Sequence, residues 1–345
     1  MIDRHSPPPR VRWRGDLPVA EIAQLAGVSQ PTVSKVLNGR AGVGDSTRRR
    51  VESLLREHGY RRPAAAPGTA GVEVLFSGML AYIALEVVRG IEDVAAARDL
   101  TVSVTDIARR AAAGQSWIEP LLLRRPVGVI AAFAGFTDEH LELLDAGDIP
   151  VVTLDPIGDV HPVPSVGSNN WSGALAATRH LLGLGHRRIG VITGPVKDLA
   201  ARARLDGFRA GLDAAEVPFD EGLLRSGVFT FEDGRDLGLD LLRRPDRPTA
   251  VVCGDDLQAL GVYEAARMCG LSIPEQLSVV GFDDIEHCAW AGPPMTTVRQ
   301  PFAEMGAAAA RLVMTLAVGE RPAQTRVELG AALVVRGSTA PPAAC

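Results

Sequence analysis

Apolar residues recur at helical spacing in the first part of the chain. The three amphipathic helices that they predict span 19–26, 30–37 and 46–58. Gly27 lies between the first two, where a tight turn requires positive φ, and Ser29 can cap the second helix with Pro31 in its first turn. The pattern therefore predicts a small three-helix module that begins with two steeply crossing helices.

From residue 72 onward, short apolar runs alternate with helical segments. The predicted strands span 72–77, 100–105, 127–133, 149–154, 188–193, 250–253 and 277–282. Runs that are apolar throughout indicate parallel sheets covered by helices on both faces. An α/β segment of this length is near the upper limit for one hydrophobic core. A break in the pattern near 165–170 therefore indicates two lobes of similar construction. Ligands of such sheets bind beyond the carboxyl ends of the strands.

Two segments lack any apolar periodicity. Residues 1–15 are rich in Pro and Arg, and we expect a disordered arm there. Residues 63–71 are mostly Pro, Ala and Gly, which is typical of a linker. The three-helix module is therefore assigned to 16–62 and the α/β body to 72–345.

The formal net charge of -5 conceals an uneven distribution. Residues 1–66 contain 12 Lys/Arg and 6 Asp/Glu, a net of +6, whereas the remaining residues contain 24 and 35, a net of -11. This asymmetry indicates that the N-terminal part with the three-helix module, called the head below, approaches a polyanion such as nucleic acid, and that the α/β body does not.

Several classes of protein are not supported by the sequence. The four cysteines lack the spacing of a disulfide framework or a metal site: Cys253, Cys269, Cys288 and Cys345. Neither a signal peptide nor an apolar run long enough to span a bilayer is found, so we expect a cytoplasmic protein without a membrane partner. Because the serine-hydrolase elbow, the phosphate loop and the zinc-protease motif are missing, we also expect no enzyme and no cofactor.

Residues 17–62 read LPVAEIAQLAGVSQPTVSKVLNGRAGVGDSTRRRVESLLREHGYRR. This string closely resembles the DNA-binding head of the lactose-repressor/galactose-repressor (LacI/GalR) family of bacterial transcriptional regulators. The resemblance implies a helix-turn-helix whose second helix enters the major groove of operator DNA.

The physical properties of the second helix agree with that assignment. A helix in the major groove presents its N-terminal residues to base edges, which places Gln30, Pro31 and Lys35 in reading positions. The expected phosphate contacts are short polar side chains and one arginine: Ser29, Thr32, Ser34, Asn38 and Arg48. Alternatively, Ser29 acts only as a helix cap, and Gln30 and Lys35 form a solvated helix face.

The linker departs from the family pattern. Family members usually carry an Asn and an Ala-Arg-x-Leu sequence there, which form a hinge helix whose Leu enters the minor groove. The corresponding residues here read PAAAPGTA, and Pro67 and Gly68 disfavour a helix. We therefore expect no such hinge helix. Arg10, Arg12 and Arg14 of the arm are alternative phosphate or minor-groove contacts.

The resemblance continues from residue 72 to about 336, through the segments LGHRRIGVITGP, VVCGDDLQALGVYEAARMCGLSIPEQLSVVGFDD and PPMTTVRQPFAEMG. It implies a two-lobed core like that of periplasmic sugar-binding proteins. We assign an N-lobe to about 72–165 and 294–322, and a C-lobe to about 166–293 and 323–340.

A sugar pocket needs carboxylates and arginine for hydroxyl groups and an aromatic ring for the apolar sugar face. The resemblance pairs Asp283 with Arg204 as hydroxyl-binding groups. The full set of expected effector-binding residues is Glu86, Asn170, Trp171, Arg204, Phe229, Asp255 and Asp283.

Structural alternatives remain open for this set. Asp255 and Asp283 can cap helices, Arg204 can form an ion pair between lobes, and Trp171 can belong to the core. The pairs 255–256 and 283–284 are also compatible in principle with a metal ion or with acid-base catalysis. Asp106 and Asp155 end strands too, but the sequence gives no independent reason to include them.

The resemblance thus implies a repressor, active as a homodimer or tetramer, that binds pseudo-palindromic operator DNA and responds to a small effector, most simply a sugar. It also implies dimer contacts through 72–97 and 295–316. A purine-type co-repressor-dependent regulator and an effector-blind repressor are the alternatives.

Overall fold

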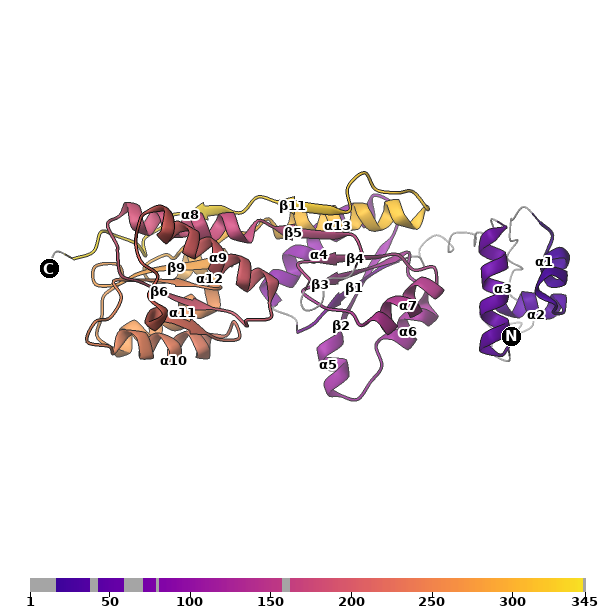
Figure 1. Ribbon diagram of the computed structural model, residues 1–345, viewed down its shortest axis with the longest axis horizontal. Helices are drawn as coiled ribbons and strands as arrows, with labels where there is room; N and C mark the ends of the chain where they lie inside the picture. Colours follow the sequence, from indigo (N-terminus) through magenta and orange to yellow (C-terminus); the bar gives the residue numbers. More distant parts are fainter. Residues whose placement is uncertain (1–16, 38–42, 59–70, 79–80, 157–161, 344–345) are drawn as a thin grey trace, which may run out of the picture. The chain divides into compact units, whose positions relative to one another are not determined.

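The computed structural model describes residues 17–37, 43–58, 71–78, 81–156 and 162–343 (Figure 1). The chain divides into two compact units, Met1–Pro67 and Gly68–Cys345. The expected N-terminal arm, the linker and Asn38 lie outside the described residues, apart from Gly71, the last linker residue.

The first unit contains the three predicted helices, α1 (Val19–Ala26), α2 (Gln30–Leu37) and α3 (Asp45–Glu57). Gly27 ends α1 with φ of 64°, which confirms the predicted left-handed turn. Ser29 caps α2 by accepting a hydrogen bond of 3.3 Å from the Thr32 amide. Apolar side chains from all three helices, including Ile22, Val33 and Val51, form the core of the unit.

The second unit contains two six-stranded sheets, one for each lobe. The N-lobe sheet has the order β11-β5-β4-β3-β1-β2, and all its strands are parallel. Its strands are β1 (Gly71–Phe76), β2 (Thr101–Asp106), β3 (Gly128–Ala132), β4 (Val151–Leu154), β5 (Ser165–Ser168) and β11 (Arg326–Leu329).

The C-lobe sheet has the order β12-β10-β9-β8-β6-β7, with only β12 antiparallel to its neighbour. Its strands are β6 (Ile189–Thr193), β7 (Leu224–Ser226), β8 (Ala250–Cys253), β9 (Ser278–Asp283), β10 (Thr296–Arg299) and β12 (Ala332–Val334). β6, β8 and β9 are buried along their whole length, as their continuous apolar runs predict.

Helices cover both faces of each sheet (Figure 1). Those of the N-lobe are α4 (Ala81–Ala96), α5 (Ile107–Ala112), α6 (Ile118–Arg124), α7 (Asp138–Ala146) and α13 (Phe302–Ala317). Those of the C-lobe are α8 (Asn170–Gly183), α9 (Leu199–Ala214), η1 (Glu221–Leu223), α10 (Phe231–Leu242), α11 (Asp256–Met268) and α12 (His287–Trp290). Among the described residues, no helix is long and apolar enough to cross a membrane.

The chain crosses between the lobes three times, after β5, after β10 and after β11. These crossings correct the expected lobe boundaries, because β5, β10 and β11 each extend past the predicted limits of 165, 293 and 322. The crossing segments are 169, 300–301 and 330–331. The sequence pattern missed them because none of these short strands is a continuous apolar run: β5 and β10 carry Ser, Gly and Thr, and β11 carries Arg and Glu.

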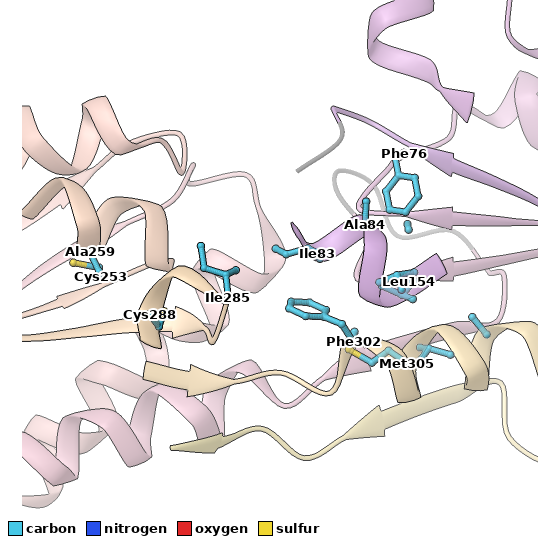
Figure 2. Packing of buried hydrophobic residues seen from close by; sticks show 14 of the residues in the cluster. Phe76, Ile83, Ala84, Leu154, Cys253, Ala259, Ile285, Cys288, Phe302 and Met305 are labelled. Atoms are coloured by element: carbon cyan, nitrogen blue, oxygen red, sulfur yellow. The ribbon is translucent and has the colours of Figure 1, made fainter. Parts of the chain in front are cut away.

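A buried apolar cluster continues from one lobe into the other. Figure 2 shows Ile83 on α4 and Ile285 after β9 near the junction between the lobes, with Phe302 beside them. All three side chains are at least nine-tenths buried. Any rotation of one lobe against the other must therefore rearrange these contacts.

Candidate functional site

One face of α2 packs on the core of the first unit, and the opposite face is exposed. Val33, Val36 and Leu37 are buried. The predicted base-reading residues Gln30, Pro31 and Lys35 are all exposed on this helix. A helix with an exposed polar N-terminal turn has the geometry required for contact with base edges.

The predicted phosphate contacts surround this face. Ser29 and Ser34 are exposed, whereas Thr32 on α2 and Arg48 on α3 are half-buried. The hydroxyl groups of Ser29 and Thr32 lie 2.9 Å apart and form a hydrogen bond. Short hydroxyl groups at a helix N-terminus suit phosphate oxygens, because backbone N–H groups point in the same direction.

A second polar cluster lies at the carboxyl edge of the C-lobe sheet, and Arg204 on α9 is its centre. Its guanidinium Nε donates 2.8 Å to Asn170 Oδ1, its Nη1 donates to the Gly254 carbonyl, and its Nη2 lies 3.4 Å from Asp283 Oδ1. The same group lies 3.9 Å from the centre of the Phe282 ring. The structure thus brings together three of the predicted residues.

Asp283 is held at the end of β9 in a strained conformation. Its φ is 114°, in the region that favours glycine, and its carboxylate accepts a hydrogen bond of 2.6 Å from Gln300 Nε2. Asp155 after β4 and Phe229 after β7 also have positive φ, 39° and 62°. Strained residues that gather at the carboxyl ends of strands mark a functional site.

Three carboxyl groups of the cluster have raised pKa values. Burial, together with the charge of Asp283, raises the pKa of Asp255 to about 7. Burial also raises the pKa of Asp155 to about 7 and that of Asp283 to about 6, while the positive charge of Arg204 opposes both shifts. Asp255 also caps α11, since its Oδ1 accepts 2.8 Å from the Gln258 amide, so the helix-cap alternative holds for this residue.

Aromatic side chains form the apolar part of the cluster. The Arg204 guanidinium lies 5.9 Å from the centre of the half-buried Phe229 ring. That ring occupies the space in front of Gly194, where any Cβ would overlap it. On the N-lobe side, Phe133 follows β3 with φ of 51° and packs edge-to-face on Phe302.

Two buried polar atoms at the lobe crossings have no hydrogen-bond partner among the described residues, Ser168 Oγ and Gln300 Oε1. Both residues are more than nine-tenths buried. The Ser168 amide donates 3.3 Å to Asp155 Oδ1, and Gln300 donates to Asp283, so both orphan groups belong to the cluster. Buried polar groups normally find a partner, which a polar ligand would supply here.

The sequence did not single out Ser168, Asp155 or Gln300 as site residues. Asp155 carried a usable signal, because it directly follows a predicted strand. Ser168 and Gln300 carried none, since their positions depend on lobe crossings that the pattern did not resolve.

Two expected residues are not joined to the cluster. Glu86 on α4 forms an ion pair of 2.7 Å with Arg89, and its side chain is 43% exposed. Trp171 on α8 is 43% exposed, and among the described contacts no ring or hydrogen-bond interaction links it to Arg204. Neighbours in sequence on a helix point in different directions, so Asn170 faces the cluster and Trp171 does not. Effector contacts of Glu86 and Trp171 stay a prediction.

The neighbouring acids have structural partners. Asp256 is buried, accepting hydrogen bonds from the Thr297 hydroxyl at 2.5 Å and the Ile285 amide at 2.9 Å. Asp284 forms ion pairs of 2.6 Å with both Arg299 and Arg336. Within the described ranges, no group of His, Cys, Asp and Glu is arranged to hold a metal ion.

A surface cavity of about 290 Å³ lies at the opposite, amino edge of the C-lobe sheet, near Ile189. Its two arginines are already engaged: Arg187 donates to the carbonyls of Leu182 and His186, and Arg188 pairs with Asp220 at 2.9 Å. This cavity lacks the orphan polar groups of the carboxyl edge, and we do not assign the effector to it.

Comparisons with known protein families match both units. Residues 19–63 match the model described as bacterial regulatory proteins, lacI family. Residues 178–339 match the model of a periplasmic binding protein-like domain. The two matches agree with the helix-turn-helix head and the two-lobed α/β body, and confirm the expected fold.

Complete relatives extend the match to nearly the whole chain. The HTH-type transcriptional regulator MalR of Streptomyces coelicolor is 33% identical over 344 residues, which cover 93% of this chain and 96% of that protein. The structure of the transcriptional regulator CelR with cellobiose is 30% identical with a TM-score of 0.69, and covers 93% of this chain and 99% of that one.

The lac repressor dimer, solved on operator DNA with the anti-inducer ONPF, is 27% identical with a TM-score of 0.68, covering 94% of this chain and 99% of that one. These relatives are DNA-binding regulators and not enzymes, as the sequence motifs led us to expect. The chain belongs to the lacI family of bacterial transcriptional regulators.

Proposed function

We propose that this regulator is a repressor whose affinity for its operator is controlled by a sugar bound at the Arg204 cluster. The carrying observation is the convergence of Arg204, Asn170 and Asp283 beside two orphan polar groups. The cluster lies at the carboxyl edge of a parallel sheet, where ligands of α/β proteins bind.

The chemistry of the cluster fits a polyhydroxyl ligand. Asp155, Asp255 and Asp283 are acceptors for hydroxyl donors, and Ser168 Oγ can either donate or accept. Phe229 offers a half-buried ring for the apolar face of a pyranose. A purine also stacks on a ring, but it presents fewer donors for three carboxyl groups.

Similar proteins support the sugar. The CelR structure contains cellobiose, and its match covers nearly all of this chain. We transfer the class of ligand, and not the particular sugar, to the Arg204 cluster.

The DNA-binding half of the proposal rests on α2. Gln30 and Lys35 read bases, while Ser29, Thr32, Ser34 and Arg48 bind phosphates. A homodimer formed through 72–97 and 295–316 presents two such helices, which predicts a pseudo-palindromic operator. Closure of the lobes on the effector changes how the dimer presents its two heads, and this links the two binding reactions.

The test is a thermal-melt screen of the full-length protein against sugars and purines. A ligand that binds the folded state stabilises it by RT ln(1 + [L]/Kd), about 2.7 kcal/mol at a hundredfold excess over Kd. A sugar that raises Tm in the wild type but not in Arg204→Ala supports the proposal. A purine that does so instead identifies a purine-dependent regulator, and no response to any ligand identifies an effector-blind repressor.

A further inference from the structure

Helix N-termini at the carboxyl edge of an α/β sheet are the usual binding sites for phosphate groups. In the C-lobe, the N-termini of α9 and α11 are closed by acidic side chains of the protein itself, whereas α8 and α10 are capped by the neutral side chains of Asn169 and Thr230. Asp198 caps α9 by accepting 3.0 Å from the Ala201 amide, and Asp255 caps α11 by accepting 2.8 Å from the Gln258 amide. The dipoles of α9, which carries Arg204, and of α11 therefore already have anionic partners.

The central cation is committed in the same way. Arg204 directs Nε to Asn170, Nη1 to the Gly254 carbonyl and Nη2 to Asp283. The fork that binds phosphate in a bidentate manner elsewhere is thus occupied by protein acceptors. Lys197, next to Asp198, is exposed and its charge is screened by water.

The charge balance of the cluster disfavours a further anion. Asp155, Asp255 and Asp283 line the cluster, and Arg204 is the cation whose charge acts on all three. The orphan Gln300 Oε1 is a further acceptor, which would face phosphate oxygens without a proton to share. A buried anion that lacks a cation is strongly disfavoured.

From this arrangement we infer that the effector is a free, uncharged sugar, and that its phosphate esters are excluded. This inference rests on the sugar-binding function proposed above and names the chemical class of the ligand. The signal is then the sugar as released by glycoside hydrolysis or imported unmodified, and the phosphoryl-transfer reaction that consumes this sugar also removes the signal.

The experiment uses calorimetry at pH 7.5 to measure the Kd of the full-length protein for each member of matched pairs of a sugar and its phosphate ester. The pairs are D-glucose with D-glucose 6-phosphate, D-ribose with D-ribose 5-phosphate, and maltose and cellobiose with their monophosphates. A phosphate ester carries a charge of about -1.5 to -2 at this pH. Since like charges in a desolvated site are strongly disfavoured, we expect the ester of the binding sugar to bind at least ~100-fold more weakly.

The variant Asp155→Asn removes one negative charge but keeps an acceptor for the Ser168 amide. It should narrow the affinity gap, which is the ratio of the ester's Kd to the sugar's Kd, at least ~10-fold, as expected from a close charge pair. Asp206→Asn on α9 is the control, because this side chain is 61% exposed and removes the same charge from the surface. It should leave the gap unchanged.

Three outcomes are distinguishable. Tight binding of a free sugar and weak binding of its ester, with the gap narrowed in Asp155→Asn alone, supports the inference. An ester that binds as tightly as its sugar overturns the inference and leaves the proposed function intact. If no member of any pair binds, the proposed sugar function fails, and the inference fails with it.

Discussion

Gln300 Nε2 donates a hydrogen bond of 2.6 Å to Asp283 Oδ1, and this contact joins a lobe crossing to the centre of the proposed effector site. Gln300 lies between β10 in the C-lobe and α13 in the N-lobe. A ligand that engages Asp283 therefore competes for, or reorients, a bond that helps to set the angle between the lobes.

Asp283→Asn tests the importance of this carboxylate. The amide fills the same space, but it cannot accept the charge-assisted hydrogen bonds that ligand hydroxyl groups donate to a carboxylate. Effector affinity should therefore fall about 10- to 100-fold. Calorimetry measures this loss, and operator binding without effector should remain as in the wild type, because the head folds as its own compact unit.

The adjacent Asp284 supplies the matched control. Its two ion pairs of 2.6 Å with Arg299 and Arg336 are structural, so Asp284→Asn should lower the free energy of unfolding by roughly 3 kcal/mol. Where the variant remains folded, its effector affinity should stay close to that of the wild type. The reverse pattern for the two variants contradicts our assignment of roles.

The stability of the ligand-free protein should depend on pH through Asp255. Its pKa is raised from 3.8 to about 7 on folding, so the folded state binds the extra proton. The stability that this protonation provides is complete below pH 3.8 and is lost as the pH rises through about 7. Its loss between pH 5 and pH 7 amounts to roughly 2 kcal/mol.

Urea unfolding of the wild type and Asp255→Asn at pH 5, 6, 7 and 8 measures this effect. Asn can retain the α11 cap, so the comparison isolates the charge. The variant should become steadily more stable relative to the wild type as the pH rises. A difference that is independent of pH would show that Asp255 is already ionised at pH 5.

Gly194→Ala should weaken effector binding without a change at any polar contact. The added Cβ overlaps the Phe229 ring, which must leave its position beside Arg204. Loss of one ring stack corresponds to about a 10-fold lower affinity. Gly183→Ala on α8 is the control, since a Cβ there meets no atom within 4 Å and should not weaken binding.

Substitutions on the head should separate base reading from phosphate binding. Gln30→Ala and Lys35→Ala should each change the preference at one operator position by about 1 to 3 kcal/mol. Arg48→Ala should weaken binding to every sequence alike. It should also reduce the slope of log K against log [salt] by about one, because one phosphate contact is lost.

Selection of operators from a random library with each variant checks these roles. Ser53→Ala, an exposed position on α3, serves as the control. An unchanged preferred operator for Gln30→Ala would mean that α2 docks in a different orientation.

The sequence predicted those elements whose stability is local. The limits of β8 and of the first two helices agree with the predicted ranges, because continuous apolar strands and capped amphipathic helices are specified by their own residues. β5, β7, β10, β11 and β12 were not predicted. Their buried or half-buried residues include Ser168, Thr296 and Thr297, whose burial depends on distant partners such as Asp256 and Ser338.

The site was predictable only in part, for the same reason. Family resemblance identified Arg204 and Asp283, and the structure shows that they meet although they come from different elements. Ser168 and Gln300 join them through the lobe crossings, which no local pattern specifies. Conversely, the predicted Glu86 already has a partner on its own helix in Arg89.

The most direct test of the account is the effect of a saturating sugar effector on operator affinity, measured by fluorescence anisotropy with the full-length protein. We predict a change of about 5- to 150-fold, a coupling of 1 to 3 kcal/mol, and the same factor in effector affinity when operator is bound. Arg204→Ala should abolish the change while leaving operator binding intact. Equal operator affinity with and without a sugar shown to bind at this cluster would contradict the account.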